Sequence, residues 1–523
     1  MRPIIDDLIQ LKTGVEVQVK QSDDKIEKRT VRMRILCTIL DLPATKKLFF
    51  LKGSNGECGC SFCLNPGVPV PNNPLVRHYL CDKQFALRDS SSMKKAEEAL
   101  KRGEGIDGVI GVSIMSEYSC ILELLTIDPM HNSFLGNCLR ILKLFVCSSF
   151  HEYDWYISPQ NQEKLDGELT SVKLPSIYHK NIRSIIKDLP HFKADELRIF
   201  ALYLLPVFKK YIKETYHEFL DTFRDACRIA CSKNPTTQEL KKAGVLFQNL
   251  SISSKRLFGK YCGTINMHYF EHVGIFLEKF GPFYNYSSFP YEGLIGIFMS
   301  FRTGTYRFQQ HMCWMFNTYY YLDQMEKTYA FNDDMKLFLN RLGSPNFPLE
   351  RRSIRVSDNI SLVGKSKVQK GTLLNTEIFR KCCINGFIFV GREKSLKNKT
   401  NDYSCKYVTR KTVDRIAKDP KIPADPNGML FNKDSNSQLI EKVEKVQIVE
   451  EKRGEIIRFE KYTNNRGNDM GTRAIIVPLE HKQTSTKELS IPLEDIVEPL
   501  IVVRTENCFY TSELVGPMND QYK

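Results

Sequence analysis

Residues 57–67 read ECGCSFCLNPG and place three cysteines close together in the chain. Cys60 and Cys63 are separated by two residues, a spacing that allows two thiolates to bind one zinc ion. Cys58 is either a third thiol that competes for the metal or a neighbour without a role. A tetrahedral zinc site needs two further ligands, so these cysteines are at most half of a site.

The second half of the site is predicted in residues 266–282, which read NMHYFEHVGIFLEKFGP. His268 and His272 are four positions apart and therefore lie on the same face of a helix, where both imidazoles can reach one metal ion. We expect Asn266 to cap this helix and Gly281 to end it. The alternative is a pair of surface histidines on an amphipathic helix.

The length and composition indicate a multidomain protein. A chain of 523 residues predicts two to four domains. Its longest apolar runs, such as IFALYLLPVF, are much too short to span a membrane. The N-terminal MRPIIDDLIQLK has acidic residues where a signal peptide is apolar. We therefore expect an intracellular protein, no membrane association, and sixteen cysteines that are mostly reduced.

The chain carries an excess of positive charge. It has 75 Lys and Arg residues against 61 Asp and Glu residues, which gives a net charge of +14. Such an excess favours a polyanionic partner, because Lys and Arg release counterions from a phosphate backbone. A basic protein without such a partner is an equally open interpretation.

The hydrophobic pattern changes along the chain and predicts five regions. Residues 30–41, TVRMRILCTILD, predict a strand that enters a covered sheet and ends at Asp41. Apolar residues at three-to-four spacing then predict helices, and late in the chain VEEKRGEIIRF predicts a β-hairpin. The predicted regions are 1–112, a helical block over 113–262, a motif-rich return over 263–330, a connector over 331–369 and a β-rich domain over 370–523.

Several acidic residues are candidates for a site. Asp41 follows the predicted strand, where open α/β sheets place their ligands, although the local sequence favours a cap for the turn before Pro43. Glu292, in YSSFPYEGLIGIFMSF, is predicted in the first turn of a helix, where a carboxylate is favourable without any catalytic role. Asp128 and His131, in LTIDPMHNSFLGN, could be a capping Asp with a turn histidine.

Taken in order, these motifs resemble the transposases of CACTA (EnSpm-like) DNA transposons. A more distant similarity is to the catalytic subunit of the V(D)J recombinase. The resemblance extends over residues 1 to about 311 and rests on the ordered motifs CTILDLPA, NGECGCSFCLNPG, IDPMHNSFLG, FKADELRIFALYLLPVFKKYI, NMHYFEHV, GPFYNYSSFPYEGLIG and GTYRFQQ.

The resemblance implies an α/β protein with a partial RNase H-like fold, interrupted by a large all-helical insertion and followed by a small β-rich C-terminal domain. It implies DNA cleavage and strand transfer by a DDE triad of carboxylates, acting on double-stranded transposon ends in the nucleus as a homo-oligomer. Asp41 and Glu292 would be the second and third triad members and would bind catalytic Mg²⁺. Structural zinc would be held by Cys60, Cys63, His268 and His272, and a supporting role falls to Asp128 and His131.

One departure from the family makes catalysis by this chain uncertain. The family's first triad Asp lies upstream of the segment that matches IIDDLIQL, and Asp6 and Asp7 fall inside the predicted helix there. We therefore expect an N-terminally truncated transposase that is inactive by itself. Two alternatives stay open: a host-adapted, non-catalytic DNA- or protein-binding module, and a globular protein without metal.

Overall fold

The computed structural model describes most of the N-terminal two thirds of the chain and the strands of the C-terminal third. The described residues are 2–20, 26–71, 73–79, 84–175, 178, 181–300, 307–328, 335, 353–357, 359–363, 366–370, 374–384, 387–391, 404–417, 442–464, 469–478, 489–492, 496–504 and 509–513. The chain divides into two units. The first comprises Met1–Ser171, Ile182–Pro345 and Val515–Lys523, and the second comprises Val172–Asn181 and Asn346–Leu514.

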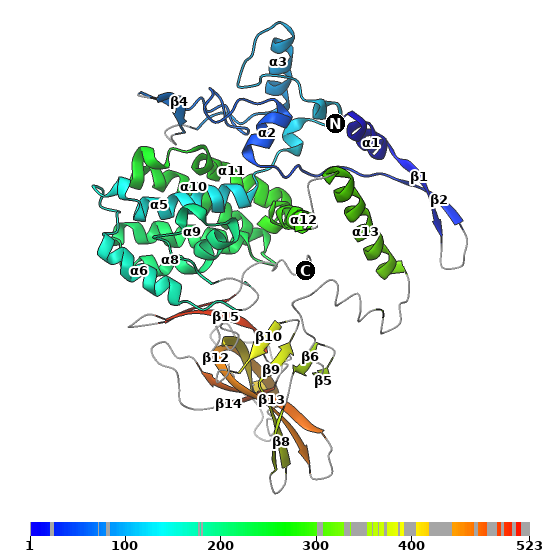
Figure 1. Ribbon diagram of the computed structural model, residues 1–523, viewed down its shortest axis with the longest axis vertical. Coiled ribbons are helices and arrows are strands. Elements are labelled where there is room, and N and C mark those ends of the chain that lie inside the picture. Colours follow the sequence, from blue (N-terminus) through cyan, green and yellow to red (C-terminus); the bar gives the residue numbers. More distant parts are fainter. Residues whose placement is uncertain are drawn as a thin grey trace, which may run out of the picture. The chain divides into compact units, whose positions relative to one another are not determined.

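The first unit begins with short helices and two hairpins (Figure 1). The predicted amphipathic helix at the N-terminus is present and buries Ile5. Both hairpins pair antiparallel strands, β1 with β2 and β3 with β4. The elements are α1 Arg2–Thr13, β1 Val15–Lys20, β2 Ile26–Val31, α2 Leu42–Phe49, β3 Val68–Val70, β4 Asn73–His78 and α3 Ser90–Lys101.

The strand predicted over residues 30–41 is wrong beyond Val31. Residues 32–41 form no strand, because their backbone groups bond to scattered partners instead of one neighbouring strand. The Met33 amide donates to Leu11 and the Thr38 amide to Leu124. The segment is not covered on both faces either, since Leu36 is 75% exposed.

Helices dominate the rest of the first unit. The block predicted as helical over 113–262 is built of helices, although π-helical turns occur at Met130–Cys138 and Phe200–Leu204. Figure 1 shows α5, α6 and α8–α11 gathered together, and their buried faces are rich in phenylalanine. The elements are η1 Ile114–Glu117, α4 Ile121–Leu124, η2 Met130–Cys138, α5 Leu139–Val146, η3 Ser148–Phe150, α6 Pro159–Ser171, η5 Leu189–His191, α7 Ala194–Ile199, η6 Phe200–Leu204, α8 Leu205–Phe208, η7 Glu214–Tyr216, α9 His217–Ala230, α10 Thr237–Phe258, η8 Gly259–Cys262, α11 Ile265–Phe280, η9 Phe283–Tyr286, α12 Phe289–Ser300 and α13 Phe308–Thr328.

Helices α10 and α11 cross at two glycines. A Cβ atom added at Gly244 would lie 2.9 Å from the Cα of Gly274, so the crossing requires that neither residue has a side chain. This close approach holds α11, the helix of His268 and His272, firmly against the helical block. Among the described residues, no helix is both long enough and apolar enough to cross a bilayer.

The second unit is made of antiparallel strands in two sheets. One sheet has the strand order β10-β9-β6-β5, and the other has the order β14-β13-β12-β11-β15-β16 with β8 and β7 attached to β12. The strands are β5 Ser353–Ser357, β6 Ile360–Val363, β7 Lys367–Lys370, β8 Leu374–Phe379, β9 Lys381–Ile384, β10 Phe387–Val390, β11 Ser404–Ala417, β12 Lys442–Asn464, β13 Asp469–Pro478, β14 Leu489–Pro492, β15 Ile496–Arg504 and β16 Phe509–Glu513.

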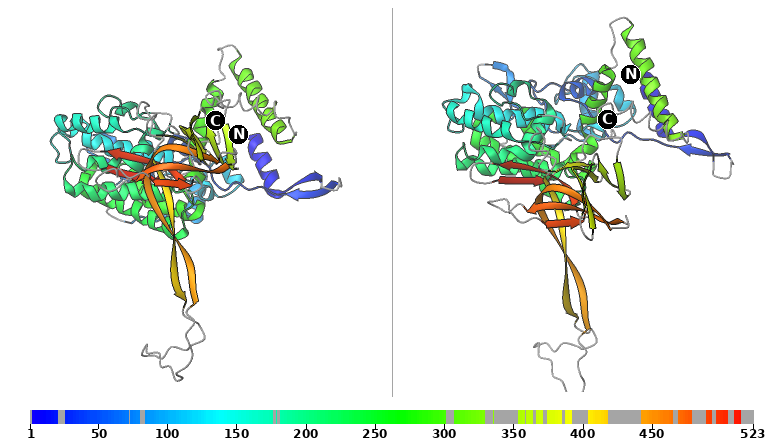
Figure 2. Two further views of the ribbon diagram at one scale, coloured as in Figure 1. Left: turned by 90° about the horizontal axis from the view of Figure 1, so that it is seen from below. Right: turned by 60° about the horizontal axis from the view of Figure 1, so that its bottom comes forward.

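Two predictions for this part of the chain are wrong. The predicted connector over 331–369 contains β5, β6 and most of β7, so the β region starts earlier than residue 370. The predicted hairpin in VEEKRGEIIRF is absent, because those residues lie inside the continuous strand β12. Gly454 does not turn the chain, since it pairs with Cys405 of β11 and Pro478 of β13. Figure 2 shows β11 and β12 as a long two-stranded ribbon.

The chain therefore contains both helices and sheets, as the predicted α/β class requires. All strand pairs among the described residues are antiparallel. Residues 301–306, which include the start of the motif GTYRFQQ, and most of 329–352 lie outside the described residues.

Candidate metal centre and acidic site

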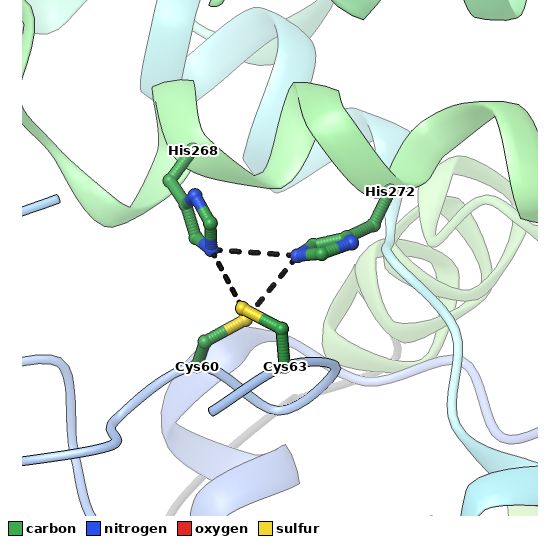
Figure 3. Close-up of side chains that lie close together, drawn as sticks. All are labelled: Cys60, Cys63, His268 and His272. Atoms are coloured by element: carbon green, nitrogen blue, oxygen red, sulfur yellow. Dashed lines mark hydrogen bonds between the residues drawn. The ribbon is translucent and has the colours of Figure 1, made fainter. Parts of the chain in front are cut away.

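Cys60, Cys63, His268 and His272 converge in the first unit (Figure 3). Cys60 Sγ lies 3.5 Å from His272 Nε2, and Cys63 Sγ lies 3.2 Å from His268 Nε2. The two histidine Nε2 atoms are 3.4 Å apart. All four side chains are buried, and residues separated by 205 positions in the sequence thus meet at one point.

These distances match the edges of a zinc coordination tetrahedron. With Zn–S bonds of about 2.3 Å and Zn–N bonds of about 2.05 Å, tetrahedral geometry places ligand atoms about 3.3 to 3.8 Å apart. The three measured edges, from 3.2 to 3.5 Å, lie close to that range. Two thiolates and two imidazoles fill all four positions, so the cluster could hold a metal such as zinc in a closed, structural manner.

Each half of the cluster is positioned by its own local structure. Thr264, and not the predicted Asn266, caps α11 by accepting a hydrogen bond from the Met267 amide. On the cysteine side, the Phe62 amide donates to Cys60 Sγ. Gly59 has to be glycine, because a Cβ atom there would lie 2.3 Å from the carbonyl oxygen of Gly53.

The histidine ligands also have outer contacts. Glu271 Oε1 lies 3.2 Å from His268 Nδ1 and accepts a hydrogen bond from the Ser251 hydroxyl. A carboxylate behind a metal-binding imidazole fixes the orientation of the ring and makes its free nitrogen more basic. Tyr79 stacks on the His268 ring, with the centroids 5.5 Å apart. The cluster therefore has the second layer of contacts that metal sites require.

The pKa values of the cluster side chains are shifted by burial and by their contacts with one another. Burial by itself raises the pKa of Cys60, but hydrogen bonds from Cys63, His268 and His272 bring it well below its ordinary value. The hydrogen bond to Cys60, together with burial, raises the pKa of Cys63. Burial lowers the pKa of His268, yet Cys60 and Glu271 raise it to about 9. Metal binding would therefore displace protons from Cys63 and His268.

Cys58 does not belong to the cluster. Its sulfur lies 3.6 Å from the Leu64 carbonyl oxygen. The residue has a left-handed backbone, with φ of 52°, which is uncommon outside glycine. Of the two sequence interpretations, the structure supports Cys58 as a neighbour and not a competing ligand.

In the structure, Asp41 and Glu292 have the roles that were the alternatives to metal binding. Asp41 is a helix cap, and Glu292 is a carboxylate in the first turn of a helix. Asp41 does not end a strand; it caps α2 by accepting a hydrogen bond of 2.7 Å from the Ala44 amide. Glu292 lies in the first turn of α12 and is exposed. Among the described residues, the Cys/His cluster is the one group of three or more potential ligands close enough to share a metal ion.

Asp128 joins two helix starts. Its Oδ1 accepts from the Met130 and Ser288 amides, at 3.2 and 2.8 Å. Its Oδ2 accepts from the His131 amide at 3.3 Å and lies 2.5 Å from His131 Nδ1. The carboxylate is buried and has four donors, so its hydrogen-bonding capacity is filled. Because Ser288 immediately precedes α12, Asp128 holds the start of the helix that carries Glu292.

The pKa of His131 responds to three acidic residues. Its hydrogen bond with Asp128 raises the pKa of His131, while burial lowers it. The charges of Asp128, Asp41 and Glu292 raise the pKa further. Charges from segments that are far apart in sequence thus act on one imidazole. A small pocket beside it is lined by Asp128 and His131 and, from the metal side, by Ser61, Phe62 and Tyr269.

Sequence reasoning missed three residues of this region. Glu271 could have been found, because it is three positions after His268 and therefore on the same helix face. Lys46 and Arg88, which bond to the cysteine loop, carry no local signal that links them to it. Burial lowers the pKa of Lys46 to about 7, against the opposing influence of Cys60.

No protein-family model, curated protein or solved structure matches the chain. The function is therefore inferred from the geometry and chemistry of the residues described above.

The raised pKa of His131 predicts a pH-dependent stability. A group whose pKa is higher in the folded state stabilises the fold fully below its unfolded value of about 6.5, and this stabilisation is lost as the pH rises through the folded pKa. Replacement of His131 by glutamine should therefore cost more stability at about pH 6 than at about pH 9. Urea unfolding of both proteins across this range measures the difference. A cost that does not change with pH would contradict the assignment.

Proposed function

We propose that the chain is a transposase-derived, DNA-binding protein with a structural zinc clamp and part of a Mg²⁺ site. In this proposal Cys60, Cys63, His268 and His272 hold the zinc ion. Asp41 and Glu292 are two carboxylates of the Mg²⁺ site, mounted on an RNase H-like core that the helical block interrupts. The substrate is double-stranded DNA at transposon ends, bound in the nucleus by a homo-oligomer.

The proposal is carried by the Cys/His cluster, in which Cys60 and Cys63 meet His268 and His272. The Cys/His cluster ties the loop after α2 to α11, and only the short helix η9 separates α11 from α12. The clamp thus keeps the helix capped by Asp41 near the helix that carries Glu292. This is what a structural metal would contribute to a site built from distant segments.

The proposed chemistry assigns separate tasks to the two metals. Transposition proceeds by in-line displacement at phosphorus, for which two Mg²⁺ ions activate the attacking oxygen and stabilise the leaving one. Carboxylate oxygens suit Mg²⁺, whereas thiolate and imidazole suit zinc, so the two sets should not exchange metals. The hydrogen bond with Asp128 raises the pKa of His131 and so favours its protonated form, which can donate to a phosphate oxygen.

The same carboxylates also explain why we expect no cleavage by this chain alone. Asp128 cannot act as a third ligand, because four donors already occupy its oxygens. Asp41 and Glu292 remain, and two carboxylates hold a pair of Mg²⁺ ions poorly. The chain should bind duplex DNA and leave the phosphodiester bond intact.

Binding and cleavage assays test the proposal together. Affinity for duplex DNA should fall steeply with salt, because phosphate contacts release counterions. The double variant Asp41→Asn/Glu292→Gln should keep DNA binding and lose Mg²⁺ binding, while the exposed pair Glu98→Gln/Glu104→Gln, which loses the same two charges, serves as the control. Metal-dependent nicking that survives the double substitution would defeat the assignment of these carboxylates. Absence of DNA binding at low salt would defeat the DNA-binding function.

A second function is favoured by the local role of Asp41. An aspartate that caps α2 and an exposed glutamate in a first helix turn need no metal. On this view the chain is a non-catalytic DNA- or protein-binding module that keeps the zinc clamp for its architecture. Unchanged Mg²⁺ binding in the double variant, together with retained DNA binding, would support it.

A further inference from the structure

We infer that Lys46 and Arg88 are positioning residues that hold the cysteine loop in its metal-binding shape before the metal arrives. The inference rests on the zinc site proposed above and is independent of any reaction on DNA. Neither residue is near the loop in sequence, and neither is a metal ligand. Both act through the backbone of the residues that precede and include Cys60.

The two cations bind consecutive carbonyl groups of the loop. Lys46 Nζ donates to the Gly59 carbonyl at 2.5 Å and to the Ser61 hydroxyl at 2.7 Å. Arg88 Nε donates to the Cys60 carbonyl at 3.1 Å, and its Nη2 donates to the Cys58 carbonyl at 2.8 Å. Every carbonyl from Cys58 to Cys60 is therefore held by a cation.

Lys46 and Arg88 are buried in the fold, so their polar groups depend on the loop for hydrogen-bond partners. Both side chains are only 7% exposed, and in the part of the chain that the structure describes neither forms an ion pair with a carboxylate. A buried cation without a counterion is costly. The loop carbonyl groups and the Ser61 hydroxyl offset that cost here.

The backbone of the loop explains why it needs such support. Cys58 has a left-handed conformation, which is strained at a residue other than glycine. Its carbonyl oxygen accepts from Arg88, and a Cβ atom at Gly108 would lie 2.3 Å from that same oxygen. Without the two cations, the loop would relax and its sulfurs would leave the positions that the metal needs.

Metal affinity of the full-length chain tests the inference. Lys46→Met and Arg88→Met should each bind one zinc ion with an affinity about 10- to 100-fold below that of the wild type, as loss of outer contacts does at other sites. Competition with a chromophoric chelator gives the affinity, and the absorption of bound Co²⁺ reports tetrahedral thiolate coordination. Lys95→Met, an exposed lysine of α3, is the control for loss of a positive charge.

The outcomes separate this inference from the zinc assignment. Wild-type affinity in both methionine variants would overturn the inference and leave the zinc site standing. A wild-type chain without zinc affinity would overturn both. If a methionine variant does not fold, Arg88→Lys decides, because lysine keeps the charge but cannot reach both carbonyls. It should weaken zinc binding, and unchanged affinity in Arg88→Lys would overturn the role of the two-carbonyl contact.

Discussion

Replacement of Cys63 by serine should remove the bound metal and destabilise the first unit by about 5 kcal/mol or more. The clamp closes a loop of 205 residues, and a cross-link over such a length restricts the unfolded chain by about 5 kcal/mol. Whole domains are stable by only about 5–15 kcal/mol. Loss of the clamp would therefore leave the first unit marginally folded. Zinc content and thermal unfolding of the purified chain measure the two effects.

Cys58 provides a matched control for this experiment. Cys58→Ser changes a thiol of the same loop that lies outside the cluster, so it should keep one zinc ion per chain and nearly the wild-type melting temperature. A chelator should lower the stability of the wild type and of Cys58→Ser alike, and leave Cys63→Ser unchanged. A Cys63→Ser protein with full zinc content would contradict the assignment of the ligands.

Asp128→Asn should destabilise the first unit by about 3–5 kcal/mol, although it changes only one oxygen to an amide nitrogen. The carboxylate is buried and accepts four hydrogen bonds, and removal of one partner of a buried charged network has costs of this size. An amide nitrogen would point a donor at backbone N–H groups. We expect the start of α12 to loosen as well, because Ser288 loses its acceptor.

The effect at α12 can be measured directly. Hydrogen exchange of the Ser288 amide should accelerate in Asp128→Asn more than exchange within α10, which Asp128 does not contact. Asp41→Asn is the matched control, since asparagine caps a helix about as well as aspartate, and its stability should stay within about 0.5 kcal/mol of the wild type. Equal stability of the two variants would show that Asp128 does not hold the two helix starts together.

The sequence was most informative where a short, regular pattern determines the structure. The helices between residues 113 and 262 follow from their apolar spacing. Two short spacings made the cysteine pair and the histidine pair candidates, and the family resemblance joined them into the one cluster that the structure contains. Glu292 was correctly expected in a first helix turn. In each case, the residues that decide the structure lie within one or two turns of each other.

The predictions that failed concern features that the local sequence does not determine. These features depend on which segments lie beside the residues in the folded chain. Residues 32–41 have the composition of a strand, but the described chain places no neighbouring strand along them. Gly454 has the sequence context of a turn, yet β11 and β13 pair with it on both sides. Lys46 and Arg88 could not be predicted as partners of the cysteine loop, since only the tertiary structure brings them there.

The distance along the chain between the two halves of the metal cluster has a consequence for protein synthesis. At about 5–20 residues per second, the ribosome makes His268 about 10–40 s after Cys63. During that interval the cysteine loop has no imidazole partner, and its thiols are open to oxidation or to other metals. Capture of zinc by the complete cluster must come late, after α11 has left the ribosome and packed on α10. A cell with little available zinc would therefore accumulate chains in which the cluster has not yet captured its metal.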